Sequence, residues 1–240
     1  MIDVNFNFFT EVKEGQDPDA KSPTLKRYHK ILWSKSLPNG KIFNLNDDDP
    51  ELSKNYLYHK SELGYFVFGS DAITNSYRSH KRKKHITEQI PDEVNEMFLQ
   101  GSNIASYSIF PKNKINNGQT INMARGVVRL IDDRFDLTLE CIKRFYKNLP
   151  SPLYSTLFKY KDFFDLFESF DNYVEYFLFQ DLVDNKGEIK FYLPFDNFKT
   201  PPCFNSVEDY LIYKTKALDF NTLRKSRINK EVNNVKIIKK

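Results

Sequence analysis

The stretch that decides the fold is residues 110–146, FPKNKINNGQTINMARGVVRLIDDRFDLTLECIKRFY. Its pattern predicts a loop over 111–119, a short extended segment over 127–131, and a helix over 133–146 that begins at Asp133 as N-cap. Polar side chains gather where these pieces meet. We therefore expect the candidate site here, built from Thr120, Asn122, Arg125, Asp132, Asp133, Arg134, Asp136 and Glu140.

Toward the amino terminus, short runs that alternate or are wholly apolar predict strands. A helix is expected from Pro23, because Ser22 before it is a good N-cap and proline is tolerated at the first helical position. The predicted strands cover residues 3–10, 41–45, 55–59, 64–68 and 104–110, and two further short helices are expected over 70–78 and 92–99.

Toward the carboxyl terminus the apolar spacing becomes mainly helical. Helices are predicted over residues 153–168 and 206–228, and a strand over 188–195. The nearly continuous apolar run over 173–183 fits a buried helix or a buried strand, because its periodicity does not distinguish the two.

Together these segments predict an α+β fold. A mixed or antiparallel sheet from the first half would pack against helices that come mainly from the second half. No repeat, linker or composition break divides the chain, so residues 1–230 are expected to form a single domain. Residues 231–240 are expected to form a basic, flexible tail.

The composition predicts a soluble globular protein, with 40% hydrophobic and 28% charged residues and with 22 Phe and 14 Tyr to fill an aromatic-rich core. No stretch approaches about 18 uninterrupted apolar residues, so we expect no signal peptide, no membrane partner and a cytoplasmic location. Cys141 and Cys203 have no spacing typical of zinc ligands or of a disulfide framework. No metal site is therefore predicted from them.

A basic run over residues 78–85, RSHKRKKH, stands out although the net charge is only +4. A phosphate-facing patch would contact nucleic acid through Lys81, Arg82, Lys83 and Lys84, with the lysine-rich tail from Arg224 as a second basic segment. A solvated loop or helix face is the simpler interpretation of such a run.

Two arginines of the central stretch, Arg125 and Arg134, can hold a phosphate or carboxylate by forked hydrogen bonds, with Asn122 beside them. An internal ion-pair network is the competing interpretation. It would join Arg134 to Asp132 or Glu140, and Glu140 to Arg144 at i, i+4. Asp136 and Glu140 share one helical face, a spacing that also makes magnesium a possible cofactor together with a phosphate substrate.

Two histidines, His29 and His59, are candidates for general acid–base catalysis because imidazole titrates near physiological pH. A partly buried histidine bonded to the backbone is the alternative for each. Arg27 is a candidate ligand-binding cation, but on a helix it points roughly 160° away from His29, so the two cannot face one ligand on a straight helix.

Several strings of this sequence resemble an uncharacterised bacterial family known as domain of unknown function 6994. They are SPTLKRYHKILWSK at 22–35, TINMARG at 120–126, DRFDLTLECI at 133–142, YFLFQDLV at 176–183 and FYLPFD at 191–196. The resemblance spans about residues 6–228 and implies a single-domain bacterial protein. It implies no reaction, cofactor or catalytic residue, and the basic run lies outside it.

The main functional hypothesis is a polar Arg/Asn/His pocket that binds or acts on a phosphate-bearing ligand, either a nucleotide or nucleic acid. A non-catalytic module that binds nucleic acid or a protein through residues 78–85 and the tail is the alternative. A further alternative is an ADP-ribosyltransferase-like enzyme with Glu140 as its catalytic acid and Arg27 or His29 and Ser70 as its partners. The sequence leaves open whether the chain is an enzyme, and its oligomeric state.

Overall fold

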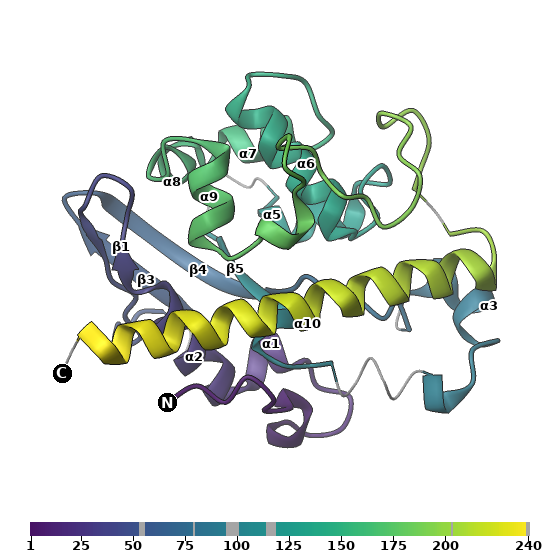
Figure 1. The fold of residues 1–240 in the computed structure, drawn as a ribbon, viewed down its shortest axis with the longest axis horizontal. Helices are drawn as coiled ribbons and strands as arrows, with labels where there is room; N and C mark the ends of the chain where they lie inside the picture. Colours follow the sequence, from purple (N-terminus) through teal and green to yellow (C-terminus); the bar gives the residue numbers. More distant parts are fainter. Residues whose placement is uncertain (53–55, 79, 95–100, 114–118, 203, 239–240) are drawn as a thin grey trace.

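The computed structural model describes residues 1–240 except 53–55, 79, 95–100, 114–118, 203 and 239–240. Within these residues the strands all come from the first half of the chain, whereas the second half is mainly helical (Figure 1). The α+β prediction is confirmed. None of the helices in the described part is long and apolar enough to cross a membrane.

The main sheet has three antiparallel strands in the order β3-β4-β5. These are β3 (Leu57–Ser61), β4 (Gly64–Ala72) and β5 (Tyr107–Pro111). A two-stranded sheet of β1 (Lys35–Ser36) and β2 (Ile42–Phe43) follows the first long helix. In the main sheet His59 lies opposite Phe66, and Ser70 lies opposite Ile109. This register places polar residues of β4 next to the central stretch.

The first half contributes short helices around one longer helix. The long one is α2 (Pro23–Trp33), and it begins as predicted, with the Ser22 side chain accepting a hydrogen bond from the backbone N–H of Leu25 at 3.0 Å. The short ones are η1 (Phe8–Glu11), α1 (Pro18–Lys21), η2 (Lys81–Lys83), α3 (Lys84–Thr87) and η3 (Ile104–Ser106).

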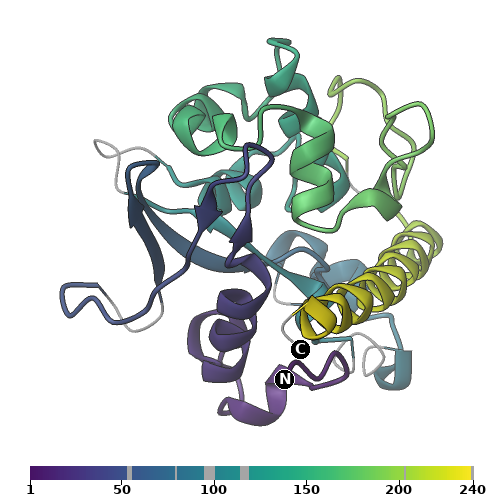
Figure 2. The ribbon, with the colours of Figure 1, turned by 60° about the vertical axis from the view of Figure 1, so that its left-hand side comes forward.

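The second half builds a helical layer and one long helix. Its elements are α5 (Ile121–Val127), α6 (Phe135–Tyr146), α7 (Tyr154–Phe158), α8 (Lys161–Asp165), α9 (Phe170–Tyr176), η4 (Gln180–Leu182) and α10 (Val207–Ile238). Helices α5 to α9 lie on one side of the main sheet, α1 and α2 lie on the other, and α10 runs along the molecule (Figures 1 and 2). The core between these layers is rich in aromatic side chains, as the composition predicts.

Four predicted segments are wrong. Residues 3–10 contain turns and η1 rather than a strand, and residues 70–78 are the end of β4 and a loop rather than a helix. Residues 127–131 form the end of α5 and a turn, and residues 188–195 form only an isolated bridge between Ile189 and Val183. In each case a short apolar pattern fits more than one structure, and side-chain bonds to distant segments decide which one forms.

Three helix boundaries also differ from the prediction. The segment 153–168 is two helices with a break at Lys159–Tyr160, and α10 continues to Ile238 instead of ending near 228. The N-cap residue of α6 is Arg134 rather than Asp133, because the Asp133 side chain contacts cations instead of the helix amides. Residues 173–183, left open between helix and strand, form the end of α9, a turn, η4 and the bridge residue Val183. Most of the helix expected over 92–99 lies outside the described residues.

Candidate functional site

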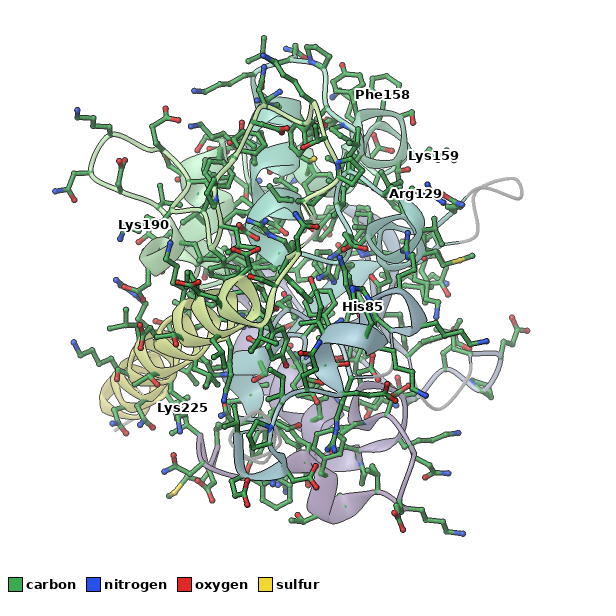
Figure 3. All side chains as sticks on the ribbon, turned by 90° about the vertical axis from the view of Figure 1, so that its right-hand side faces the viewer. His85, Arg129, Phe158, Lys159, Lys190 and Lys225 are labelled. Carbon is green, nitrogen blue, oxygen red and sulfur yellow. The ribbon has the colours of Figure 1, made fainter. Side chains whose placement is uncertain are left out.

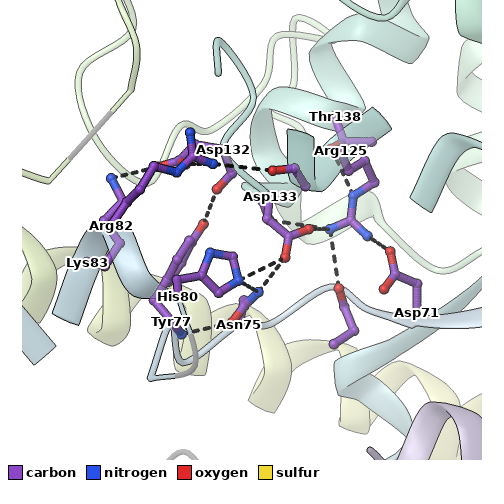
Figure 4. Close-up of polar contacts among 12 residues, drawn as sticks. Asp71, Asn75, Tyr77, His80, Arg82, Lys83, Arg125, Asp132, Asp133 and Thr138 are labelled. Carbon is purple, nitrogen blue, oxygen red and sulfur yellow. Dashed lines mark hydrogen bonds and ion pairs between the residues drawn. The ribbon is translucent and has the colours of Figure 1, made fainter. Parts of the chain in front are cut away.

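The loop between α5 and α6 carries two adjacent aspartates in a strained conformation. Asp132 and Asp133 have φ values of 49° and 62°, in the left-handed region that non-glycine residues adopt at a cost. The backbone N–H of Asp133 donates to the carbonyl of Arg125 at 2.9 Å, which closes the loop. This backbone turns the two carboxylates toward cations that come from different elements, and these contacts hold the conformation (Figure 4).

Arg125 is the buried centre of this network, with 0% of its surface exposed. Its guanidinium forms an ion pair with Asp71 of β4 and lies 3.4 Å from the Oδ1 atom of Asp133 (Figure 4). It also donates to the Thr138 hydroxyl and to the Ala72 carbonyl, both at 3.2 Å. These contacts fit the predicted ion-pair network. The hydrogen-bond donors of the guanidinium are bonded to groups of the protein itself.

The predicted basic run joins the same network at its other end. The Nζ atom of Lys83 lies 2.6 Å from Asp132, and Lys83 is only 1% exposed. Arg82 approaches the same carboxylate at 3.4 Å, and the Nε2 atom of His80 lies 3.7 Å from Asp133 (Figure 4). The basic run and the central stretch, which the sequence presents as separate features, therefore meet at the two aspartates.

Other cations near the basic run also have acidic neighbours. Arg78 pairs with Asp92 at 2.7 Å, and Lys84 pairs with Glu88 at 3.1 Å. Lys81 is exposed and makes no ion pair among the described residues. Most of the positive charge of residues 78–85 is thus balanced within the molecule.

An acidic cavity of about 250 Å³ opens beside this network, lined by Asp17, Asp19, Asp71 and Asp133. Burial raises the pKa of Asp71 to about 7, against the opposing pull of the Arg125 charge, and burial raises the pKa of Asp19 to about 6. Such carboxyl groups can accept or donate a proton near neutral pH. Across the described residues, no group of three or more His, Cys, Asp or Glu side chains is arranged to hold a metal ion.

The remaining candidates of the central stretch lie apart from this cavity. Arg134 pairs with the buried carboxylate of Asp136 rather than with Asp132 or Glu140. Glu140 pairs with Arg144 at 2.7 Å, as the i, i+4 spacing predicts. The side chain of Asn122 donates to the Ser70 carbonyl of β4 at 3.2 Å.

His29 is buried between α2 and β4. Its Nδ1 accepts from the Trp33 indole at 3.1 Å, so Nε2 carries the hydrogen and donates to the Ser70 hydroxyl at 2.9 Å. Burial, together with the Arg224 charge, lowers the pKa of His29 to about 3. The ring is therefore neutral at physiological pH, and both of its nitrogens are engaged within the fold.

His59 is equally buried, on β3. Its ring stacks on Phe43 with centroids 4.2 Å apart, and its Nε2 lies 2.7 Å from the Ser61 hydroxyl. Nδ1 lies 3.1 Å from the backbone nitrogen and 2.8 Å from the carbonyl oxygen of Asn44, so either tautomer finds a partner there. These contacts fix the ring in the wall of a second cavity.

This second cavity has a volume of about 470 Å³ and lies between α2, β3 and the segment after β2. None of the described residues that line it is acidic. The lining residues are Arg27, Lys30, Ile31, Ser34, Ile42, Asn44, Leu45, Asn46, His59, Lys60 and Ser61. Arg27 and His59, both candidates from the sequence, therefore share one cavity, whereas Arg125, Arg134, Asn122, His29 and Glu140 do not line it.

A family model for a family of unknown function, DUF6994, matches residues 2–228, which is nearly the whole chain. The chain belongs to the DUF6994 family. No curated protein and no solved structure matches it.

Sequence reasoning missed several residues that complete both cavities in this DUF6994 chain. Asp19 lies in α1, Asp71 lies near the end of β4, and Lys60 lies in β3. The only signal in the sequence is charge complementarity, since an arginine in an apolar segment is often paired with a carboxylate. Complementarity alone does not say which of the 32 acidic residues supplies it.

Proposed function

We propose that this DUF6994 protein binds a phosphate-bearing ligand, such as a nucleotide, in the cavity lined by Arg27, Lys30 and Lys60. This cavity is called the cationic cavity below. One observation carries the proposal. Arg27 and Lys60 line a concave site, and neither forms an ion pair with any described residue.

The backbone brings the cations together from two elements. Arg27 and Lys30 are three residues apart on α2, a spacing that puts them on neighbouring positions of one helix face. Lys60 comes from β3, next to His59, whose stacked and hydrogen-bonded ring keeps that part of the strand in place. A rigid frame of this kind lowers the entropy that is lost when a ligand binds.

The donors around the cavity suit phosphate oxygens. Arginine offers a planar fork that matches phosphate, and lysine offers a compact positive charge. Side chains of Ser34, Asn44 and Asn46 add neutral hydrogen-bonding groups. Asp47 binds Lys30 at 2.8 Å and Lys26 at 3.8 Å, so it offsets part of the Lys30 charge.

The cavity also has an apolar side. Ile31 and Ile42 are 46% and 53% exposed, respectively, and both line it. A ligand that carries a flat or apolar group next to its phosphate would cover these side chains and gain free energy from removing them from water. This favours a nucleotide over inorganic phosphate.

Isothermal titration with AMP, ADP, ATP and inorganic phosphate tests the proposal. The wild-type chain should bind at least one nucleotide, and affinity should fall as salt rises from about 50 to 200 mM, because exposed charges are screened. The double substitution Arg27→Ala and Lys60→Ala should weaken binding at least tenfold without unfolding the protein. Arg129→Ala and Lys159→Ala, at exposed positions away from this cavity, serve as the charge-matched control (Figure 3).

Two results would overturn the proposal. One is that no phosphate-bearing compound binds to the wild-type chain at low salt. The other is that binding survives in the Arg27/Lys60 variant and is lost in the control variant. Titrations with and without magnesium show whether a divalent ion accompanies the ligand.

A further inference from the structure

A third cavity, of about 360 Å³, is lined in part by residues from 193–202 and has no part in the cationic cavity. Eight of its thirteen described lining residues are apolar, namely Leu130, Leu137, Leu193, Pro194, Phe195, Phe198, Pro201 and Pro202. The other lining residues are Arg134, Asp196, Thr200, Asn205 and Asp209. Apolar side chains combined with a few polar groups are typical of sites for small organic molecules.

Arg134 gives this cavity a hydrogen-bond donor. The residue is 1% exposed and lines the cavity. Its Nε donates to the Asp136 carboxylate at 3.1 Å, and its Nη2 donates to the other oxygen of the same group. Nη1 has no hydrogen-bond partner among the described residues. An unsatisfied donor on a buried cation is costly, so an acceptor oxygen placed in the cavity would be favoured.

The wall around Arg134 is held in place by Arg144 of α6. The Arg144 guanidinium donates to the Asn197 side chain and lies over the Phe198 ring at 4.9 Å. Asn197 and Phe198 have φ values of 65° and 61°, so both residues occupy the left-handed region. The surrounding contacts must offset this strain, and the strained segment is therefore formed before any ligand arrives.

The charges around the cavity determine whether an anionic or an uncharged ligand is favoured. Asp136 already neutralises Arg134, and Asp136 also accepts the backbone N–H of Tyr192 at 2.9 Å. Asp196 and Asp209 line the cavity, and no cation other than Arg134 is among its described lining residues. A phosphate or carboxylate would meet net negative charge here, whereas an uncharged acceptor such as an amide carbonyl would not.

We propose that this cavity binds a small uncharged molecule that combines an aromatic ring with an amide. The ring would pack against Phe195, Phe198 and the prolines, and the carbonyl oxygen would accept from Nη1 of Arg134. The proposal is independent of the cationic cavity, because the two cavities share no lining residue.

Three probes of similar size test this inference on the full chain. N-benzylacetamide has the ring and the amide, 3-phenylpropanoate replaces the amide by a carboxylate, and propylbenzene has no acceptor. Ligand-observed and protein-observed NMR titrations should show binding of the amide. The carboxylate and the hydrocarbon should bind at least tenfold more weakly.

Two variants locate the site. Arg134→Lys keeps a positive charge beside Asp136 but removes Nη1, and it should weaken amide binding about tenfold, equivalent to about 1.4 kcal/mol. Leu130→Trp fills the cavity with an indole and should abolish binding even if Arg134→Lys fails to fold. Phe158→Ala, a change at an exposed aromatic residue that does not line the cavity, should leave amide binding unchanged (Figure 3).

The inference is overturned if the wild-type chain binds none of the probes, or if the carboxylate binds more tightly than the amide. Amide binding that persists in Leu130→Trp would equally place the ligand elsewhere and overturn it. None of these outcomes bears on nucleotide binding, which is measured separately.

Discussion

Arg125 shows how one buried residue organises a site around itself. Its charge faces Asp71 and Asp133, and its guanidinium lies over the Phe110 and Phe135 rings at 5.4 and 5.8 Å. The substitution Arg125→Ala would leave both carboxylates without their central cation. Because breaking a buried pair costs about 3–5 kcal/mol, we expect the free energy of unfolding to fall by that amount.

Urea unfolding of the Arg125→Ala variant measures this loss. Arg129→Ala, four residues further along and exposed, is the matched control and should change the free energy by less than about 0.5 kcal/mol. A variant at Arg125 that unfolds like the wild type would show that the network is not structural. Such a result would favour the alternative hypothesis, in which Arg125 binds a ligand.

Asp19 should make stability depend on pH in the neutral range. Burial raises its pKa from 3.8 to about 6, so the folded state binds more protons than the unfolded state between these values. The stabilisation is therefore fully present below about pH 4 and is lost as pH rises through 6. Asp19→Asn should stabilise the protein above pH 7, by at most about 3 kcal/mol, with little effect at pH 4.

Chemical denaturation at several pH values between 4 and 8 checks this expectation. Between pH 4 and 6 the unfolding free energy of Asp19→Asn should fall less, or rise more, with increasing pH than that of the wild type. Glu62→Gln, at an exposed turn, provides the comparison for loss of one negative charge. Equal slopes in all three proteins would contradict a raised pKa at Asp19.

His29 should give the free energy of unfolding the opposite dependence on pH from that of Asp19. Its pKa falls from 6.5 to about 3 on folding, so the unfolded chain binds a proton that the folded state excludes between these values. The stabilisation is present above pH 6.5 and is lost as pH falls. His29→Gln should therefore flatten the acid side of the stability curve, as measured by thermal unfolding between pH 4 and 7. His85→Gln, on the surface in Figure 3, should not do so.

At the scale of single residues, the sequence indicates which polar residues form the buried network better than it indicates the partner of each one. Asn122 lies in the first turn and Arg125 in the last turn of α5, a helix that the sequence does not predict, and Arg134 is the N-cap residue of α6. The partner of Arg125 is Asp71, 54 residues earlier, and no local pattern encodes that pairing. By contrast, the Glu140–Arg144 pair lies within one helix turn and is predicted correctly.

At the scale of elements, strong local signals succeed and short apolar runs fail. Ser22 and Pro23 start α2 because the cap and the proline act within one turn of the helix. The run over 127–131 is apolar but forms a turn, because the carboxylates that follow it bind cations from other elements. The strand expected over 188–195 forms only the bridge at Ile189, since no described strand lies beside the rest of it.

Helix α10 is attached to the rest of the fold by Arg224, which is 0% exposed. Its guanidinium donates to the carbonyls of Ala105, Tyr107 and Phe177 at 2.9, 2.8 and 3.0 Å. Burial lowers the pKa of Arg224 to about 9. One side chain thus joins the long helix to β5 and to the end of α9.

The substitution Arg224→Met should destabilise the protein by about 3–5 kcal/mol, because three buried carbonyls lose a charged donor. Hydrogen exchange should also quicken in α10 and β5. Lys225→Met changes the neighbouring, half-buried cation of the same helix (Figure 3), which donates to the Asn5 side chain, and should have a small effect. If both variants were equally stable, α10 would be held by its apolar face alone.

At the scale of the whole molecule, the layered arrangement follows from the order of strands and helices, but the cavities do not. Arg27 and Lys60 are 33 positions apart and meet because α2 and β3 pack together. The distance between two such side chains depends on the packing of both elements. The sequence can therefore name Arg27 as a candidate without identifying the cavity that it lines.

The distribution of charge over the whole molecule gives the last prediction. The chain has 36 Lys and Arg against 32 Asp and Glu, and within the basic run Arg78, Arg82, Lys83 and Lys84 contact carboxylates. Such pairs lower the field that a nucleic acid would meet. We expect short DNA to bind weakly in about 150 mM salt, and the double substitution Lys81→Gln and Lys84→Gln to leave that binding unchanged.

Lys83→Gln should behave differently from this double variant. It removes the cation that lies 2.6 Å from the buried Asp132, so it should lower stability rather than DNA affinity. Fluorescence anisotropy with a labelled oligonucleotide measures affinity, and urea unfolding measures stability. The Arg27/Lys60 variant separates binding at the cationic cavity from binding at the basic run. A large loss of DNA affinity in the Lys81/Lys84 variant alone would assign nucleic-acid binding to the basic run, since its remaining intramolecular pairs would still be intact.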